Sequence, residues 1–241
     1  MTARTAMAHQ RGIGLVEMLV SITLGLFLVG VTAGMLVSQL AEHRRMLLDT
    51  RLTQELRAVL DLVARDVKRA GYWGNAADAT WTGGPAYAAS NPYQGLHPAP
   101  GASDSRVGYA YSRDSSEDQV VAGSERFGLR LNTSNRSADW RTSGAALTPT
   151  DADTWQALSD PGLLRVTRVS VSAREDSVSL IDRCAVTTCP TGAADCPPRL
   201  AVRQVDIEVE GVATTDPALR RSLKAQVSLR NPTVIGTCPG A

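Results

Sequence analysis

The most constraining feature of the sequence is an apolar run over residues 13–40 that contains a single formal charge, Glu17. A helix rises ~1.5 Å per residue, so about 20 residues cross the hydrocarbon core of a bilayer. The run is therefore long enough to span a membrane as one helix. An ionisable side chain inside a bilayer is costly and is normally paired, so Glu17 calls for a partner. A short segment with Arg4, Arg11 and no acid precedes the run and ends in Gly12.

Two common kinds of apolar N-terminal segment explain this run poorly. A cleaved secretory signal needs a short apolar core followed by a small-residue cleavage site, whereas this run is longer and carries an acid. An ordinary signal anchor accommodates the length but leaves Glu17 unexplained. Gly30 and Gly34 form a small-xxx-small pair, which either permits close helix packing or reflects the frequency of glycine in membrane helices.

The stretch RGIGLVEML, residues 11–19, resembles the prepilin leader of type IV pilins and of the pseudopilins of type II secretion. The resemblance implies that prepilin peptidase cuts after Gly12 on the cytoplasmic side and that the new N-terminus, Ile13, is methylated. Glu17 then falls at the family's conserved acidic position and pairs with the N-terminal amine of an adjacent pilin. The pattern departs from the usual one in having Ile13 where Phe is common and Gly14 where Thr or Ser is common.

This arrangement answers the electrostatic problem of the apolar run. Cutting before Ile13 creates a positive amine at the lipid boundary, and Glu17 is its natural counter-charge, within one helical turn or on a neighbouring subunit. A paired charge is tolerated at low dielectric where an unpaired one is not. A glycine before the cut leaves the extended backbone without a side chain in the path of the peptidase.

Beyond residue 40 the sequence becomes charged but keeps a helical pattern as far as Gly71. Arg57 and Asp61, and likewise Asp61 and Arg65, are spaced i,i+4 as opposite-charge pairs. Gly71 suits the position just past a helix C-terminus. We therefore predict one continuous helix from residue 13 to residue 70, with an apolar stripe that a sheet covers. The stripe consists of Leu48, Leu52, Leu56, Val59, Leu60, Val63, Val67 and Ala70.

The end of this helix carries a second resemblance. The stretch LDLVARDVKRAGYWGN, residues 60–75, resembles the signature of PilW-family minor pilins, and AQVSLRNP, residues 225–232, resembles the closing strand of that family. The stretch SDSRVGYAYS, residues 103–112, loosely resembles an early strand. The minor pseudopilin J of type II secretion has a similar helix end and is the nearest alternative.

The resemblance implies an α+β, pilin-like fold in which a long N-terminal helix packs on an antiparallel β-sheet head. We expect a leader peptide at residues 1–12 and a transmembrane or filament-core half of the helix at 13–40. The amphipathic half follows at 41–71, and a periplasmic α+β head occupies 72–241.

Within the head, alternation of apolar and polar residues predicts seven strands, at 106–111, 118–122, 126–131, 163–173, 177–181, 200–210 and 223–229. In LLRVTRVSVSA the alternation places Leu164, Val166, Arg168 and Ser170 on one face. Residues 151–158 are typical of a short capped helix that ends before Pro161.

Residues 72–101 are predicted to form a long irregular loop, which is a frequent location of functional or mobile segments. Its aromatic residues fit two interpretations: they pin the loop to the head, or they form a surface for carbohydrate or for a partner. These aromatic residues are Tyr72, Trp73, Trp81, Tyr87 and Tyr93.

Four cysteines lie in the last quarter of the chain, at Cys184, Cys189, Cys196 and Cys238. An even number in an exported chain predicts two disulfides. A local Cys189–Cys196 bridge with Cys184 joined to Cys238 is one of three possible connectivities. Free buried thiols are an alternative, and a zinc site is disfavoured because the sequence has no C-x-x-C pair.

The sequence does not favour catalysis, a cofactor or a metal. The three histidines are His9, His43 and His97, and the sequence contains no nucleophile elbow, P-loop or HExxH motif. A calcium site at Asp114, Glu117 and Asp118 lacks the spacing and glycine of a recognised loop. The formal net charge of +1 gives no indication of a nucleic-acid partner.

These inferences predict a minor pilin of a type IV pilus, held in the inner membrane by its helix with the head in the periplasm, and later part of a pilus on the cell surface. The expected partners are prepilin peptidase, other minor and major pilins and the inner-membrane assembly platform. Pseudopilin J, or an adhesin-like binding module at a filament tip, are the alternatives.

Overall fold

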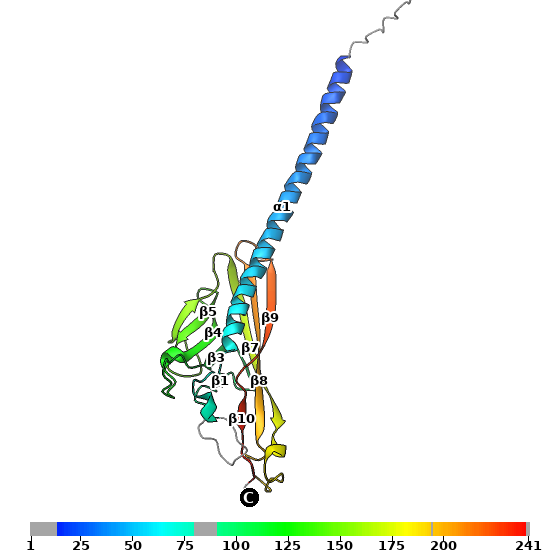
Figure 1. The fold of residues 1–241 in the computed structure, drawn as a ribbon. Helices are drawn as coiled ribbons and strands as arrows, with labels where there is room; N and C mark the ends of the chain where they lie inside the picture. The colour runs from blue at the N-terminus through cyan, green and yellow to red at the C-terminus, as the bar shows by residue number, and fades with distance from the viewer. Residues whose placement is uncertain (1–13, 80–90, 194, 240–241) are drawn as a thin grey trace, which may run out of the picture. The chain divides into compact units, whose positions relative to one another are not determined.

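A computed structural model describes residues 14–79, 91–193 and 195–239. The helix α1 runs over Leu15–Val67 and is followed by an α+β arrangement of two antiparallel sheets, which confirms the predicted fold class (Figure 1). By its internal contacts the chain divides into two units, Met1–Leu48 and Asp49–Ala241. The second unit therefore contains the last part of α1 together with every strand.

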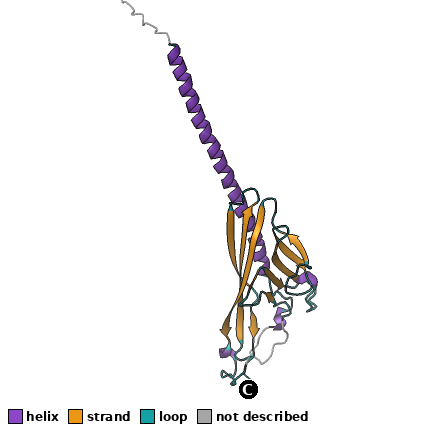
Figure 2. Cartoon of the chain, turned by 180° about the vertical axis from the view of Figure 1, so that it is seen from behind, coloured by secondary structure: helices purple, strands orange, loops and turns teal. Residues whose placement is uncertain are grey.

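The first sheet has the strand order β1-β3-β4-β5-β6. Its strands are β1 (Leu96–His97), β3 (Arg106–Ala110), β4 (Arg126–Asn132), β5 (Ser137–Ser143) and β6 (Thr154–Ala157). The second sheet has the order β10-β8-β7-β2, and β9 also pairs with β8. Its strands are β2 (Ser103–Asp104), β7 (Leu164–Ser179), β8 (Arg199–Ala213), β9 (Arg220–Ser228) and β10 (Thr233–Ile235). Among the described residues, the 3-10 helix η1 (Ala76–Ala79) follows α1, while η2 (Gly123–Glu125) and η3 (Ile181–Arg183) lie between strands. Figure 2 shows both groups of strands beside the last part of α1.

One hydrophobic core joins this part of α1 to both sheets. The predicted stripe is buried from Leu52 onward, and its side chains pack with Phe127 of the first sheet and with Val166 and Ile207 of the second. Each fully buried aliphatic side chain contributes about 1.5–3 kcal/mol. The need to cover this stripe explains why the second unit begins within the helix.

The helix ends close to where the sequence predicts, at Val67 rather than at Ala70. Residues 68–71 form turns, and Gly71 has φ of +74°, the left-handed conformation that glycine adopts without strain. The Gly71 N–H donates to the Ala110 carbonyl at 2.8 Å. This hydrogen bond joins the end of α1 to the end of β3, although the two are far apart in sequence.

The longest strand, β7, differs from its predicted pattern at one point. Its pairing with β8 shifts register between Val166 and Arg168. Leu164 and Val166 are buried before the shift, whereas Val169 and Val171 are buried after it. A bulge places one extra residue in a strand and reverses the faces that follow, so the prediction that Arg168 and Ser170 share a face with Leu164 and Val166 was wrong.

Several smaller predictions were also wrong. The predicted strands at 163–173 and 177–181 are one continuous strand, and residues 118–122 form no strand. Residues 151–158 are not a helix, because Thr154–Ala157 pair with β5 as β6. Local turn chemistry is present nonetheless, since the Thr150 N–H donates to the Asp153 carboxylate at 2.7 Å. The strand β5 was not predicted.

Candidate functional site

The first part of α1 presents apolar side chains that are exposed throughout. Every residue from Leu15 to Leu47 is exposed in the structure, and the helix is long and apolar enough to cross a membrane by length and composition. Side-chain hydroxyls in this part donate to carbonyls of the preceding turn, as Ser21 does to Glu17 at 2.7 Å and Thr32 to Leu28 at 3.0 Å. Hydroxyls satisfied within the helix carry little cost in lipid.

Glu17 lies in the first turn of α1. Its N–H donates to the Gly14 carbonyl at 3.0 Å, so its carboxylate lies at the helix N-terminus, where the helix dipole favours a negative charge. From Leu15 to Leu40 it is the sole charged side chain. Gly12 and Ile13, the predicted cleavage and methylation positions, lie outside the described residues.

At the other end of α1, Asp66 is a buried acceptor for three side chains. The hydroxyls of Tyr109 and Tyr111 donate to its carboxylate at 2.5 and 2.9 Å, and the Trp140 indole N–H donates at 3.2 Å. Burial, aided by the Asp66 charge, raises the pKa of both tyrosines well above the ordinary value, so their hydroxyls remain donors. Asp66 belongs to the stretch that resembles the PilW signature, but its role as a buried acceptor was not predicted.

Residues 60–75 and 225–232, which both resemble PilW-family stretches, contact each other at the end of α1. The Asn231 side-chain amide donates to the Ala70 carbonyl at 3.0 Å, and the Arg230 N–H donates to the Lys68 carbonyl at 3.4 Å. Asn91 similarly donates to the Gly71 carbonyl at 2.8 Å. Carbonyls at a helix C-terminus lack partners within the helix, so these two side-chain amides and one backbone N–H satisfy carbonyls directly after the end of α1.

The exposed face of α1 in the second unit borders a groove of about 430 Å³. Leu62 is 44% exposed there, and the half-buried Trp140 of β5 forms the opposite wall. The predicted i,i+4 pairs Arg57–Asp61 and Asp61–Arg65 do not form within 4.0 Å among the described residues. Arg65 on this face is exposed, whereas Arg69 contacts the Asp66 carboxylate at 3.7 Å.

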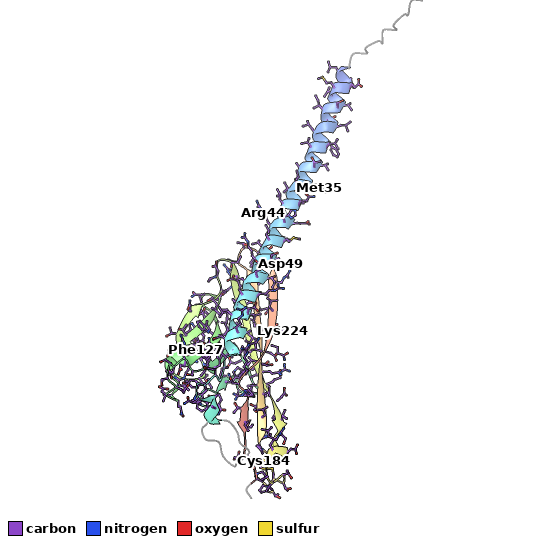
Figure 3. The ribbon with its side chains drawn as sticks, viewed as in Figure 1. Met35, Arg44, Asp49, Phe127, Cys184 and Lys224 are labelled. Carbon is purple, nitrogen blue, oxygen red and sulfur yellow. A yellow bond between two sulfur atoms is a disulfide. The ribbon has the colours of Figure 1, made fainter. Side chains whose placement is uncertain are left out.

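The structure pairs Cys184 with Cys238 and Cys189 with Cys196. The first bond joins residues 54 apart in sequence, and the second closes a separation of 7. Figure 3 labels Cys184 near the end of the long β7–β8 pair. The two bonds therefore lie around the connection from β7 to β8 and tie the segment after β10 to it.

Two of the loop aromatics belong to the interior of the head. Trp73 and Tyr93 are buried with Ala110 in a small cluster of their own. Tyr93 also donates to Glu125 at 3.2 Å. Tyr72 is 53% exposed, and Trp81 and Tyr87 lie outside the described residues. Trp73 and Tyr93 thus pin the loop and offer no free surface to a ligand.

The geometry supports neither the candidate calcium site nor a Ser-His-Asp arrangement at His97. Asp114, Glu117 and Asp118 place carboxylate oxygens within 4.8 Å of one another, but Glu117 accepts the Gly74 N–H and Asp118 accepts the Val120 N–H. His97 contacts Asp104 at 2.9 Å, and the Ser105 hydroxyl donates to the same carboxylate. No hydrogen bond joins Ser105 to His97 in the part of the chain that the structure describes, so this is not the order of a hydrolase triad.

Comparison with known families gives one match. A family model described as prepilin peptidase-dependent protein B, PpdB, matches residues 45–229. The match covers the end of α1 and nearly all of the head and begins after Glu17, so it is independent of the leader motif. No curated protein and no solved structure matches the chain.

Proposed function

Because the chain belongs to the prepilin peptidase-dependent protein B family, and is thus a pilin-like protein, we propose that it is a minor pilin of a type IV pilus. Prepilin peptidase removes residues 1–12, and Ile13 becomes the methylated N-terminus. The apolar part of α1 holds the protein in the inner membrane with the head in the periplasm. With other minor and major pilins, and on the inner-membrane assembly platform, it primes or tips the filament, as in the PilW family.

The observation that carries this proposal is the place of Glu17. It lies in the first turn of an exposed apolar helix and is the sole charged side chain from Leu15 to Leu40. An unpaired carboxylate in lipid is costly. Removal of the leader supplies a positive amine four residues away, and the amine of a neighbouring subunit supplies the same charge between chains. Glu17 thereby selects a partner that has itself been processed.

The direct test is the intact mass and N-terminal sequence of the full chain from cells with and without prepilin peptidase. We expect the mature protein to lack residues 1–12 and to carry one added methyl group, and the peptidase-deficient cells to retain the leader. A mature chain that begins at Met1 in peptidase-containing cells would rule the proposal out. So would cleavage beyond residue 30.

The minor pseudopilin J of type II secretion is the second candidate, because the Arg65–Asp66 helix end that anchors the head is the feature on which that resemblance also rests. The two functions differ in their phenotype. Deletion of a minor pilin gene removes surface pili and twitching, whereas deletion of a pseudopilin gene leaves them and blocks export of secreted proteins.

A further inference from the structure

The strand β9 forms a free edge of the second sheet. It pairs with β8 over nine residues, Arg220–Ser228, and with no other strand in the described part of the chain. Figure 1 shows β9 on the side of β8 away from β7. The register runs from Val212↔Arg220 to Gln204↔Ser228 without a shift, so no bulge turns this edge away. A long unpaired edge of this kind is a template for another strand.

The backbone groups that face the free edge follow from the hydrogen bonds at the two ends of β9. The Leu229 N–H donates to the Arg203 carbonyl at 2.9 Å, and the Ala213 N–H donates to the Leu219 carbonyl at 3.0 Å. Backbone hydrogen bonds alternate along an antiparallel pair, so the odd-numbered residues of β9 bond to β8. The N–H and C=O groups of the even-numbered residues therefore point outward. These exposed residues include Ser222, Lys224, Gln226 and Ser228.

One face of β9 already lies on the hydrophobic core. Val227 is buried there, and Leu223 and Ala225 are half-buried against the same core. A strand added beside β9 would bury apolar side chains of its own on this face. The outer side of β7 beyond Ala173 is also open among the described residues, but residues 174–179 are exposed on both faces. Strands without a buried face are marginal in water, so β9 is the better edge for a partner.

Basic side chains on an edge commonly block pairing with another strand, but those of β9 are paired within the chain. Each one contacts an acid of β8 or α1. The pairs are Arg220 with Glu210 at 3.6 Å, Arg221 with Asp49 at 2.7 Å and Lys224 with Glu208 at 3.4 Å. From Ala225 to Ser228 the strand has no charged residue. The edge is therefore neither shortened by a bulge nor protected by an unpaired charge.

We propose that β9 takes up an extended segment of a different subunit of the filament, which pairs antiparallel with it and continues the sheet from one head to another. Strand addition recognises a partner through main-chain hydrogen bonds and through alternate side chains. The incoming segment carries apolar residues beside Leu223 and Ala225, because that face meets the core, and polar residues beside Ser222 and Gln226. The inference rests on the proposed function for the class of partner and for the shared membrane.

The direction of β9 is tied to that of α1. Arg221, at the start of β9, lies 2.7 Å from Asp49, which follows the apolar part of α1. Just beyond β9, the Arg230 N–H donates to the Lys68 carbonyl at 3.4 Å, at the end of the helix. Copies anchored in one membrane therefore all present β9 running away from it. β7 and β10 run the same way, because they pair antiparallel with β8 as β9 does.

These directions make a second copy of the chain an unsuitable partner. Two β9 strands related by a two-fold axis are antiparallel, so one head would be reversed relative to the membrane. Pairing β9 with β7 or β10 of a second copy would be parallel, the less stable arrangement. The other edge strands of the described head, β1, β2 and β6, have two, two and four residues. No edge strand in that part of the chain thus offers an antiparallel partner of similar length.

The test measures amide hydrogen exchange of the full chain in membrane vesicles from its own cells and in nanodiscs that contain this chain alone. We expect the amides of Lys224 and Gln226 to exchange at least about tenfold more slowly in the vesicles, because the partner strand accepts their hydrogen bonds. Ser177 is the internal control. Like Ala173, it directs its amide to the open side of β7, so it should exchange equally fast in both settings.

Variants at one position separate the backbone from the side chain. Gln226→Pro removes an outward N–H and leaves the bonds to β8 in place, since an edge strand tolerates proline at such a position. It should return Lys224 in the vesicles to its exchange rate in nanodiscs. Gln226→Ala loses the side chain that bonds to Gln204 at 3.2 Å but keeps the N–H, so it should retain the protection. Ser177→Pro is the matched backbone change on β7 and should also retain it.

Equal exchange of the Lys224 and Gln226 amides in vesicles and nanodiscs would overturn the inference, and so would protection of Lys224 that survives Gln226→Pro. Protection in nanodiscs loaded with several copies of the chain alone would also overturn it, because the partner would then be a second copy. The intact mass of the same samples reports leader removal separately. A processed chain with unprotected β9 leaves the minor-pilin proposal standing, whereas an unprocessed chain with protected β9 leaves the strand partner standing.

Discussion

The hydroxyl of Tyr111 lies 2.9 Å from the carboxylate of Asp66, although the two residues are 45 apart in sequence. Tyr111 directly follows β3, and Asp66 lies in the last turn of α1. The Tyr109 hydroxyl and the Trp140 indole N–H also donate hydrogen bonds to this carboxylate. Each of these donors is a side chain of the first sheet or its immediate continuation. Asp66 therefore links the helix to that sheet by polar contacts, in addition to the apolar stripe.

Replacing Asp66 should destabilise the head more than any other acid of α1. Asp66→Ala leaves three donors without their acceptor, and buried unsatisfied donors cost about 1–3 kcal/mol each. We expect a loss of about 3 kcal/mol or more in the free energy of unfolding, measured by urea titration with tryptophan fluorescence. Asp61→Ala, on the exposed side of the same helix, is the control and should change it by less than about 0.5 kcal/mol. Equal losses of unfolding free energy in the two variants would mean that the hydrogen bonds to Asp66 do not stabilise the head.

Neutralising Glu17 should separate processing from assembly. Glu17→Gln keeps the helix but removes the counter-charge for the N-terminal amine, so the chain should be cut normally while surface pili fall about tenfold or more. Mass spectrometry of the chain and shear-fraction immunoblots of pili give the two readouts. Glu42→Gln, an exposed acid farther along α1, is the control. Normal piliation in Glu17→Gln would contradict the assembly role.

The two disulfides should differ in their contribution to stability. In the loop-entropy picture the Cys184–Cys238 bond, with a separation of 54, contributes about 4 kcal/mol, and the Cys189–Cys196 bond, with a separation of 7, about 2 to 3 kcal/mol. Replacing each pair by serines and comparing urea midpoints of the full chain tests the order. Thiol counting confirms that the remaining bond is intact. A larger loss from the Cys189–Cys196 pair would reverse the prediction.

Acid should weaken the first sheet through Asp153. Burial opposes ionisation of this carboxyl, but the Thr150 N–H and the charge of Arg141 at 2.8 Å together hold the pKa of Asp153 below its ordinary value. The folded state then binds the proton less readily than the unfolded chain, whose pKa is about 3.9. The stabilisation is complete above that pH and is lost as the pH falls below it.

The variant Asp153→Asn isolates this effect. It keeps an acceptor for Thr150 but leaves the buried Arg141 unpaired, so it should be less stable at neutral pH by about 3 kcal/mol. Its unfolding free energy should also depend less on pH between about 2 and 5 than that of the wild type. Parallel pH profiles for the two proteins would show that Asp153 does not titrate as described.

The helix and its stop were predictable from sequence because each depends on local chemistry. The apolar residues from Leu52 to Val67 recur at helical spacing and are buried, and a glycine stands at position 71, where the backbone is left-handed. Asp66 also left a signal, since it follows Val59 by seven residues and so falls on the buried stripe. An acid at such a position indicates a buried partner, but the sequence does not say which side chains provide it.

The parts of the fold that the sequence did not predict depend on contacts between residues far apart in the chain. The strand β5 was not predicted from alternation because its buried residues include two charged ones, Asp139 and Arg141. Asp139 pairs with Arg130 of β4, and Arg141 pairs with Asp153, which directly precedes β6. Trp140 belongs to this strand, so the groove it borders was equally unpredictable. The turn at Thr150 and Asp153 has the signature of a helix start, yet pairing with β5 and the stacking of Arg130 on Trp155 at 4.2 Å stabilise a strand instead.

The Cys184–Cys238 bond also determines how the head responds to mechanical force. It encloses β8, β9 and β10 in one covalent ring. A pull on the segment beyond Cys238 is transmitted through sulfur to the connection after β7, so these three strands cannot be peeled away one after another from that end. Under tension the strands would yield together or stay folded, and adding a reductant would allow them to unzip in sequence.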